Sequence, residues 1–408
     1  MNSDPTTQMQ AKENSTPVHL WQLDVLRGIA ILMVVLYHLQ GISYRSFGNF
    51  DLYDVKPGGH FITPSIPEFT LWATYPIYYG QSGVVLFFVL SGFCIHYSIL
   101  LSQKKAAENG TSFRFAFIPY LLRRAWRILP AYLITLTIIF AYQRWQAHLQ
   151  GEKFFIGIKD YILHVLMLHN LRPNTFQSIN PSFWSLAVEW QFYLIYPAFL
   201  FFTIRFGVMI SLACSVIVSI VCQIAVLQMT QQVTDDKIIS CWSQFPLITW
   251  FHWCLGAFVA EYWHKGRPLC RIPGSVLLML WVIMLGIAAH KPLNLFDASI
   301  VSMLWPVMFT LTLQAYIQIK RSPNFIERLI TPIGLCSYSM YLIHQPILKP
   351  MLDFVHQHRL LPDWRSIDMS VGAVVIVGVL FAISWFGFKF VETPFIKIGR
   401  SFEKKRSR

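Results

Sequence analysis

The stretch that decides the fold is residues 23–39, LDVLRGIAILMVVLYHL. An apolar run of this length can cross the hydrocarbon core of a bilayer as a helix. It nevertheless carries Arg27 near its start and His38 near its end. Ionisable side chains inside a membrane span are costly and usually face the protein interior, where they pair or serve a function. These two residues therefore raise the first functional question.

The composition indicates a membrane protein. The chain has 408 residues, of which 55% are apolar and only 13% are charged, and its mean hydropathy is +0.47. A soluble protein is about a quarter charged. The sequence therefore predicts an all-α, polytopic integral membrane protein with about ten transmembrane helices. The expected spans are 22–42, 77–101, 128–147, 183–204, 207–227, 244–263, 274–290, 299–319, 332–352 and 369–391.

The remaining segments divide the chain further. The segment 159–171 is apolar but short, so we expect a partly inserted, re-entrant or interfacial helix there. We expect a flexible cytoplasmic tail at 1–20, a transmembrane domain at 21–396 and a basic cytoplasmic tail at 397–408.

The distribution of positive charge predicts the orientation. With the amino terminus inside, the cytoplasmic connections hold 19 Lys and Arg residues and the outer connections hold 11. This asymmetry places both termini in the cytoplasm. The net charge of +13 is thereby assigned to orientation and to anionic membrane lipids rather than to nucleic acid. Seven cysteines form no CxxC pair and no Cys/His cluster, so neither a disulfide framework nor a metal site is expected.

Arg27 and His38 are predicted to share one face of their helix. Eleven residues at about 100° each leave them about 20° apart around the axis and about 16 Å apart along it. Arg27 then lies at the cytoplasmic mouth and His38 lies beyond mid-membrane. Each also has a structural interpretation, since Arg27 could be an interfacial anchor and His38 a hydrogen-bonded packing residue.

Two further clusters suggest chemistry. In FWSLAVEWQFYLIYP (183–197), Glu189 falls at a depth near that of His38, and a carboxylate there needs a proton or a partner. A histidine–carboxylate pair would suit general-base catalysis, although Glu189 could instead bond a Trp or Ser of a neighbouring helix. In RRAWRILP (123–130), Arg124 and Arg127 are helix neighbours at i, i+3 and, with Arg123, could bind phosphates or simply mark the cytoplasmic side.

Together these segments resemble the bacterial membrane acyltransferase family 3, often sugar O-acyltransferases. Its hallmark in the first span, Arg or Lys followed after ten residues by His, is matched by Arg27 and His38. Further matches follow in order over residues 20 to 400: GVVLFFVLSGF (83–93), RRAWRILP, FWSLAVEWQFYLIYP, YSMYLIHQP (338–346) and VETPF (391–395).

The resemblance implies transfer of an acyl group, usually acetyl from acetyl-CoA, to a hydroxyl of a glycan or other cell-surface acceptor in the bacterial inner membrane. Partners would be a carbohydrate or lipid-linked glycan, membrane lipids and polysaccharide-biosynthesis machinery. Some members carry an added extracytoplasmic hydrolase-like domain, which we do not expect in this chain.

The residues and the resemblance together give a working mechanism. Arg123, Arg124 and Arg127 would bind the phosphates of acyl-CoA, with Arg27 along the path of its thioester arm. His38, oriented by Glu189, would be the general base. Ser185, Tyr341 and His344 are candidate contacts to the substrate. A proton-coupled transporter or flippase of a lipid-linked or acidic substrate, with His38 and Glu189 as a proton relay, is the alternative, and a membrane scaffold is a third reading.

Overall fold

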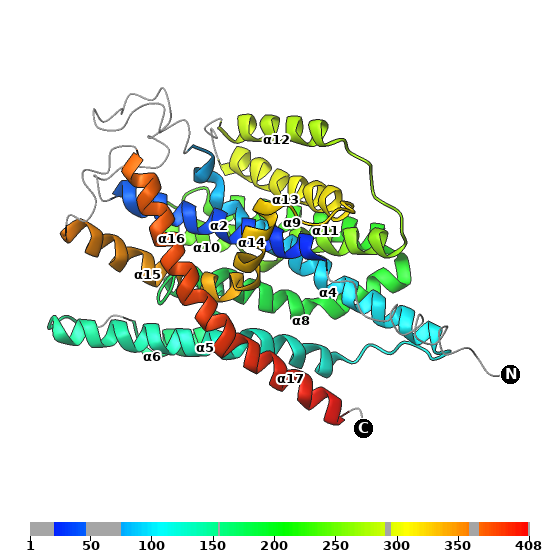
Figure 1. The fold of residues 1–408 in the computed structure, drawn as a ribbon, viewed down its shortest axis with the longest axis horizontal. Coiled ribbons are helices and arrows are strands. Elements are labelled where there is room, and N and C mark those ends of the chain that lie inside the picture. Colours follow the sequence, from blue (N-terminus) through cyan, green and yellow to red (C-terminus); the bar gives the residue numbers. More distant parts are fainter. Residues whose placement is uncertain (1–19, 46–74, 154–155, 290–294, 359–366, 407–408) are drawn as a thin grey trace.

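The computed structural model describes residues 20–45, 75–153, 156–289, 295–358 and 367–406, and throughout these ranges its regular elements are helices (Figure 1). A helix lies at each of the ten predicted spans. These helices are α2 (Trp21–Arg45), α4 (Gly83–Glu108), α5 (Phe117–Leu149), α8 (Phe183–Phe206), α9 (Val208–Thr230), α11 (Pro246–His264), α12 (Gly274–Ala289), α13 (Leu295–Ile317), α15 (Ser337–Gln357) and α16 (Ile367–Gly387).

The predicted fold class is confirmed, whereas the number of crossings stays a prediction. Within the part of the chain that the structure describes, six helical segments are long and apolar enough to cross a membrane, by length and composition. They are Trp21–Gly41, Pro76–Glu108, Phe117–Leu149, Phe183–Phe206, Val208–Thr230 and Gly372–Phe402. Two shorter apolar helices, Gly274–Ala288 and Val301–Ile317, add to them.

The helices α4 and α11 pack closely because glycines lie at their crossing. A Cβ on Gly92 would lie 1.9 Å from the carbonyl oxygen of Trp253, and one on Gly256 would lie 1.8 Å from that of Val89. Small residues let helix backbones approach in this way. The same pair of helices is joined by the buried His96, whose Nε2 lies 3.2 Å from the Glu261 carboxylate.

A second close crossing joins α2 to α14 (Phe325–Leu335). A Cβ on Gly334 would lie 1.7 Å from the carbonyl oxygen of Asp24, and one on Gly28 would lie 2.7 Å from that of Ile330. This corrects our expectation for the region, which treated 320–331 as a loop and began a span at 332. Instead, a short helix ends at Leu335 and α15 begins at Ser337.

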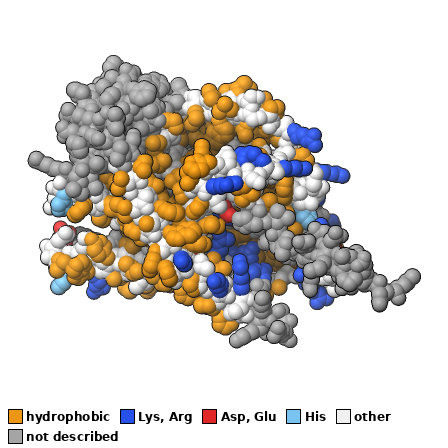
Figure 2. Space-filling model, viewed as in Figure 1, with side chains coloured by type: hydrophobic (Ala, Val, Ile, Leu, Met, Phe, Trp, Pro, Cys, Tyr) orange, Lys and Arg blue, Asp and Glu red, His pale blue; other side chains and the backbone are white. Residues whose placement is uncertain are grey.

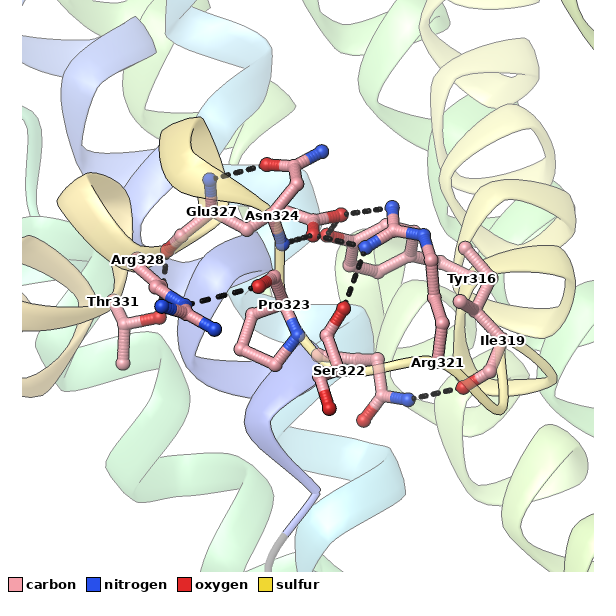
Figure 3. A network of polar contacts seen from close by, with 10 residues as sticks. Tyr316, Ile319, Arg321, Ser322, Pro323, Asn324, Glu327, Arg328 and Thr331 are labelled. Atoms are coloured by element: carbon pink, nitrogen blue, oxygen red, sulfur yellow. Dashed lines mark hydrogen bonds and ion pairs between the residues drawn. The ribbon is translucent and has the colours of Figure 1, made fainter.

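A polar network fixes the start of α14 (Figure 3). Asn324 caps the helix by accepting from the Glu327 backbone N–H at 2.9 Å, and Glu327 accepts in return from the Asn324 N–H. Arg321 donates from Nη2 to the same carboxylate at 2.8 Å, as does the Tyr316 hydroxyl at 2.6 Å. The hydrogen bonds from Arg321 lower the pKa of the Glu327 carboxyl to about 2, so it is ionised at neutral pH.

The short apolar segment near 159–171, where we expected one partly inserted helix, forms two small helices, α6 (Ile158–Val165) and η2 (His169–Leu171), and its insertion into the membrane stays a prediction. Between them His164 and His169 stack with ring centroids 3.8 Å apart and planes 6° apart, and both side chains are fully buried. Burial lowers the pKa of His164 to about 4 and that of His169 well below 6.5. Both rings are therefore neutral at pH 7.

The carboxyl-terminal segment forms the helix α17 (Thr393–Arg406). This helix includes most of the segment 397–408 that we predicted to be a basic tail. It lies beside α5 (Figure 1), and Trp126 of α5 stacks on Phe395 and Phe402 with ring centroids 6.3 and 5.7 Å away. Gly399 permits this contact, because a Cβ there would lie 2.7 Å from the Cβ of Trp126. The face in Figure 2 is largely apolar, and its lysines and arginines gather mainly in the right-hand half.

The α2–α14 crossing gives a stability prediction. Gly334→Ala should lower the melting temperature of the purified protein in detergent, because the added methyl group forces the two helices apart, at a cost of about 1–3 kcal/mol. Gly286→Ala in α12 is the matched control, because a Cβ there meets nothing within 4 Å. Equal melting temperatures for the two variants would show that the crossing tolerates a side chain.

The stacked histidines give a pH prediction. The folded-state pKa of His164 lies below the unfolded value of 6.5, so the unfolded chain binds the proton more readily. Stability is then fully present above pH 6.5 and is lost as the pH falls toward 4. Between pH 7 and pH 5, protonation of His164 in the unfolded chain should lower the free energy of unfolding by about 2 kcal/mol.

We expect His164→Phe, which keeps the stack and removes the titration, to flatten the fall in melting temperature over that interval. If the melting temperature of the variant falls with pH as steeply as that of the unmodified protein, His164 is not the group that causes the fall.

Candidate active site

One cavity among the described residues is rich in arginine. It measures about 400 Å³, and residues of α2, α4, α5, α8, α15 and α17 line it. We call it the arginine cavity, because five arginines line it together with one carboxylate. These residues are Arg27, Arg123, Arg124, Arg127, Arg400 and Glu189. The cavity therefore has an excess of positive charge, which suits a ligand with several negative groups.

Two of the arginines are held in place by neighbours. Arg27 donates to the Asp24 carboxylate and to Cys94 Sγ, at 2.9 and 3.0 Å. Arg124 lies over the ring of Tyr120, with its Cζ 4.5 Å from the ring centroid. These contacts fix the two guanidinium groups before any ligand arrives, which lowers the entropic cost of binding.

Arg127 and Arg400 are differently placed. In the described part of the chain neither forms a hydrogen bond or an ion pair, and both are exposed while lining the cavity. Their donors are available for a planar, two-point contact with a phosphate. Arg400 is a residue that our sequence analysis missed, because it assigned the basic tail to lipid and topology. Its position follows from the packing of α17 on α5.

Glu189 belongs to the arginine cavity. Its Oε1 accepts a hydrogen bond of 2.6 Å from the Tyr193 hydroxyl, which lies one turn further along α8. Tyr193 in turn lies 3.4 Å from Ser91 Oγ. The expected pair of Glu189 with His38 is therefore not formed: Glu189 bonds Tyr193 and lines the arginine cavity. Its hydrogen-bond donor is instead the Tyr193 hydroxyl on the same helix.

The second cavity measures about 430 Å³ and contains His38, so we call it the histidine cavity. Aromatic rings and side-chain amides line much of it, among them Tyr37, Tyr78, Trp184, Gln81, Gln177, Gln244 and Gln345. Rings that offer an apolar face, beside amides that can both donate and accept, suit a neutral polyhydroxylated molecule.

The ring of His38 is held in a defined tautomer. Its Nδ1 lies 2.8 Å from the Val34 carbonyl oxygen, one turn earlier in α2. Because a carbonyl only accepts, Nδ1 carries the proton and the neutral ring has its lone pair on Nε2. A neutral imidazole with a basic Nε2 at a cavity wall can accept a proton from a hydroxyl. The backbone carbonyl thus performs the orienting function that we had expected of Glu189.

The three predicted substrate contacts form a chain that starts at His38: His344 lies next to His38, Tyr341 next to His344 and Ser185 next to Tyr341, and His344 lines neither cavity. The ring of His344 meets that of His38 edge-on at a centroid distance of 5.0 Å, and its Nε2 lies 3.2 Å from Ser182 Oγ. The Tyr341 hydroxyl lies 2.5 Å from Ser185 Oγ and donates to the Ser182 carbonyl at 3.1 Å. Ser182, which we did not predict, links the two groups, and its position just before α8 gave no separate signal.

Arg27 and His38 lie on the same helix, as expected, but on different cavities. Arg27 lines the arginine cavity with the three predicted arginines of α5, whereas His38 lines the histidine cavity. Ser185 lines the former and Tyr341 lines both. Among the described residues no group of three or more His, Cys, Asp and Glu side chains is arranged to hold a metal ion.

Comparisons with known proteins identify relatives of this chain. A family model described as an acyltransferase domain matches residues 20–388. The peptidoglycan O-acetyltransferase OatA of Listeria monocytogenes is 24% identical, over 92% of this chain and 56% of its own. The O-acetyltransferase OatA of Staphylococcus aureus is 22% identical, over 94% of this chain and 58% of its own. The chain thus spans little more than half the length of these relatives, and no solved structure matches.

The arginine cavity gives a binding prediction. Replacing both Arg127 and Arg400 with Gln should raise the Kd of the purified protein for CoA at least about tenfold, because each guanidinium loses a charge-assisted contact to phosphate. Isothermal titration calorimetry with CoA measures this directly. Arg205→Gln, at the end of α8 and outside both cavities, is the matched control and should bind like the unmodified protein. If the double variant and the Arg205→Gln control bind CoA with equal affinity, Arg127 and Arg400 do not contribute to CoA binding.

Proposed function

This chain belongs to the membrane acyltransferase family 3, whose domain model matches residues 20–388, and on that premise we propose that it is a membrane-embedded O-acyltransferase. It transfers an acyl group, acetyl in the first instance, from acyl-CoA to a hydroxyl of a cell-surface glycan. The observation that carries this proposal is the separation of a cationic cavity from one that contains a histidine base.

The donor is assigned to the arginine cavity. CoA carries several phosphate charges, and four of the five arginines that line this cavity are assigned to them. Arg123, Arg124, Arg127 and Arg400 bind these phosphates, while Arg27 lies further along, where the thioester arm extends. CoA is cytosolic, so this cavity opens to the cytoplasm. Both termini are then cytoplasmic, and the protein belongs to the bacterial inner membrane.

The acceptor is assigned to the histidine cavity. Its rings and amides suit a sugar, and the names of the relatives point to peptidoglycan as one glycan of this kind. Polysaccharide-biosynthesis machinery would supply it on the outer side.

The reaction balances within these two cavities. The acceptor hydroxyl oxygen attacks the thioester carbonyl carbon while Nε2 of His38 takes the hydroxyl proton. The C–S bond then breaks, an oxygen ester forms, and the proton returns to the sulfur of CoA. We assign stabilisation of the negative charge on the carbonyl oxygen to the hydroxyl of Tyr341, which lines both cavities and would exchange its hydrogen bond to the Ser182 carbonyl for one to that oxygen.

We assign Glu189 to the donor site, the arginine cavity, rather than to the orientation of His38. It is the carboxylate among the lining arginines and is bonded to Tyr193, so its charge acts on the arginines and the thioester arm. The orientation of His38 is assigned to the Val34 carbonyl.

Release of free thiol tests the proposal. Membrane vesicles from cells that express the chain, given acetyl-CoA at their cytoplasmic face, should release CoA thiol and acetylate a glycan. His38→Ala should lower this rate by about 10²–10⁴-fold, because general-base catalysis contributes that much. His148→Ala, an exposed histidine outside both cavities, is the control and should retain the rate.

Two outcomes would contradict the proposal. Full activity in His38→Ala would remove His38 as the base. Transport of a lipid-linked substrate without any thiol release from acetyl-CoA would instead favour the transporter.

A further inference from the structure

The two cavities share part of their walls. Three side chains line both of them: Val84 and Phe88 from α4, and Tyr341 from α15. Val84 and Phe88 are four residues apart and so lie on one face of their helix. Because the same side chains face both spaces, the two cavities adjoin where these side chains lie. We call these three residues the septum.

The septum is held firmly in place. The ring of Phe88 packs edge-on against Phe192 of α8 at a centroid distance of 5.1 Å, and Phe88 is only 3% exposed. The hydroxyl of Tyr341 is bound to Ser185 at 2.5 Å. The ring of Tyr341 also meets Phe87 of α4 edge-on at 6.1 Å. Three helices therefore hold the partition, and its width is set by packing.

The reacting carbonyl must meet the hydroxyl at this partition. The arginines lie on one side of it and His38 lies on the other. A thioester whose phosphates are held by Arg124 and Arg127 can reach the acceptor only where the two cavities adjoin. The carbon chain beyond the carbonyl must then lie against Val84 and Phe88.

We infer that the septum selects the length of the acyl group, admitting acetyl and rejecting longer chains. This inference rests on the proposed function, because it assumes that acyl-CoA occupies the arginine cavity. The bond changes are those already described, so the septum takes no part in proton transfer. The effect of Val84 and Phe88 is steric: each additional methylene must displace a packed side chain, and one methylene in an apolar pocket changes the specificity constant about 10–200-fold.

Chain-length selectivity tests the inference. The rate of thiol release would be measured in the vesicles described above with acetyl-CoA, propionyl-CoA and butyryl-CoA. Phe88→Leu and Val84→Ala remove bulk from the septum and should each raise the ratio of kcat/KM for butyryl-CoA to that for acetyl-CoA about tenfold. Two variants are used because either one alone could fold poorly.

Matched substitutions on the same helix serve as controls. Phe93→Leu and Val89→Ala remove the same atoms from fully buried residues that line neither cavity, so the ratio should stay at the unmodified value. A ratio that is unchanged in both septum variants, or raised equally in the controls, would overturn the inference. If the unmodified protein releases no thiol from acetyl-CoA, the proposed function itself fails, and the inference fails with it.

Discussion

A positive charge inside an apolar helix must have partners, and the ion pair between Arg27 and Asp24 at 2.9 Å meets that need in α2. The guanidinium also reaches Cys94 of α4, so the same group joins two helices at the wall of the arginine cavity. Next to it, α14 approaches so closely that a Cβ on Gly334 would strike the Asp24 carbonyl oxygen. The position of Arg27 therefore depends on a helix crossing as well as on a charge.

The same helix that holds Arg27 also carries His38 to the second cavity. The rise of an α-helix separates the two by about 16 Å, which gives the site its length. The partition of Val84, Phe88 and Tyr341 stands between the two ends. In the function that we propose, donor binding and base catalysis are divided between these two spaces, and the chemistry takes place where they adjoin.

Much of this could be predicted from the sequence, because hydrophobic length fixes the helices and ordered motifs identify the family. The capping residues Asn324 and Glu327 were also a readable signal for α14, which we missed by treating 320–331 as a loop. Other features depend on tertiary packing. Nothing local to Glu189 indicates that it faces the arginines and bonds Tyr193. Nothing near Arg400 indicates that Gly399 would let α17 pack on Trp126 and bring that arginine to the cavity.

We propose that the donor lies in the arginine cavity with its thioester carbonyl at the partition. An experimental structure of the protein with a non-hydrolysable acetyl-CoA analogue would test this arrangement. We expect phosphate groups within hydrogen-bond distance of Arg127 and Arg400, and the carbonyl oxygen against the hydroxyl of Tyr341. An analogue whose phosphates lie in the histidine cavity, or whose carbonyl lies away from the partition, would contradict it.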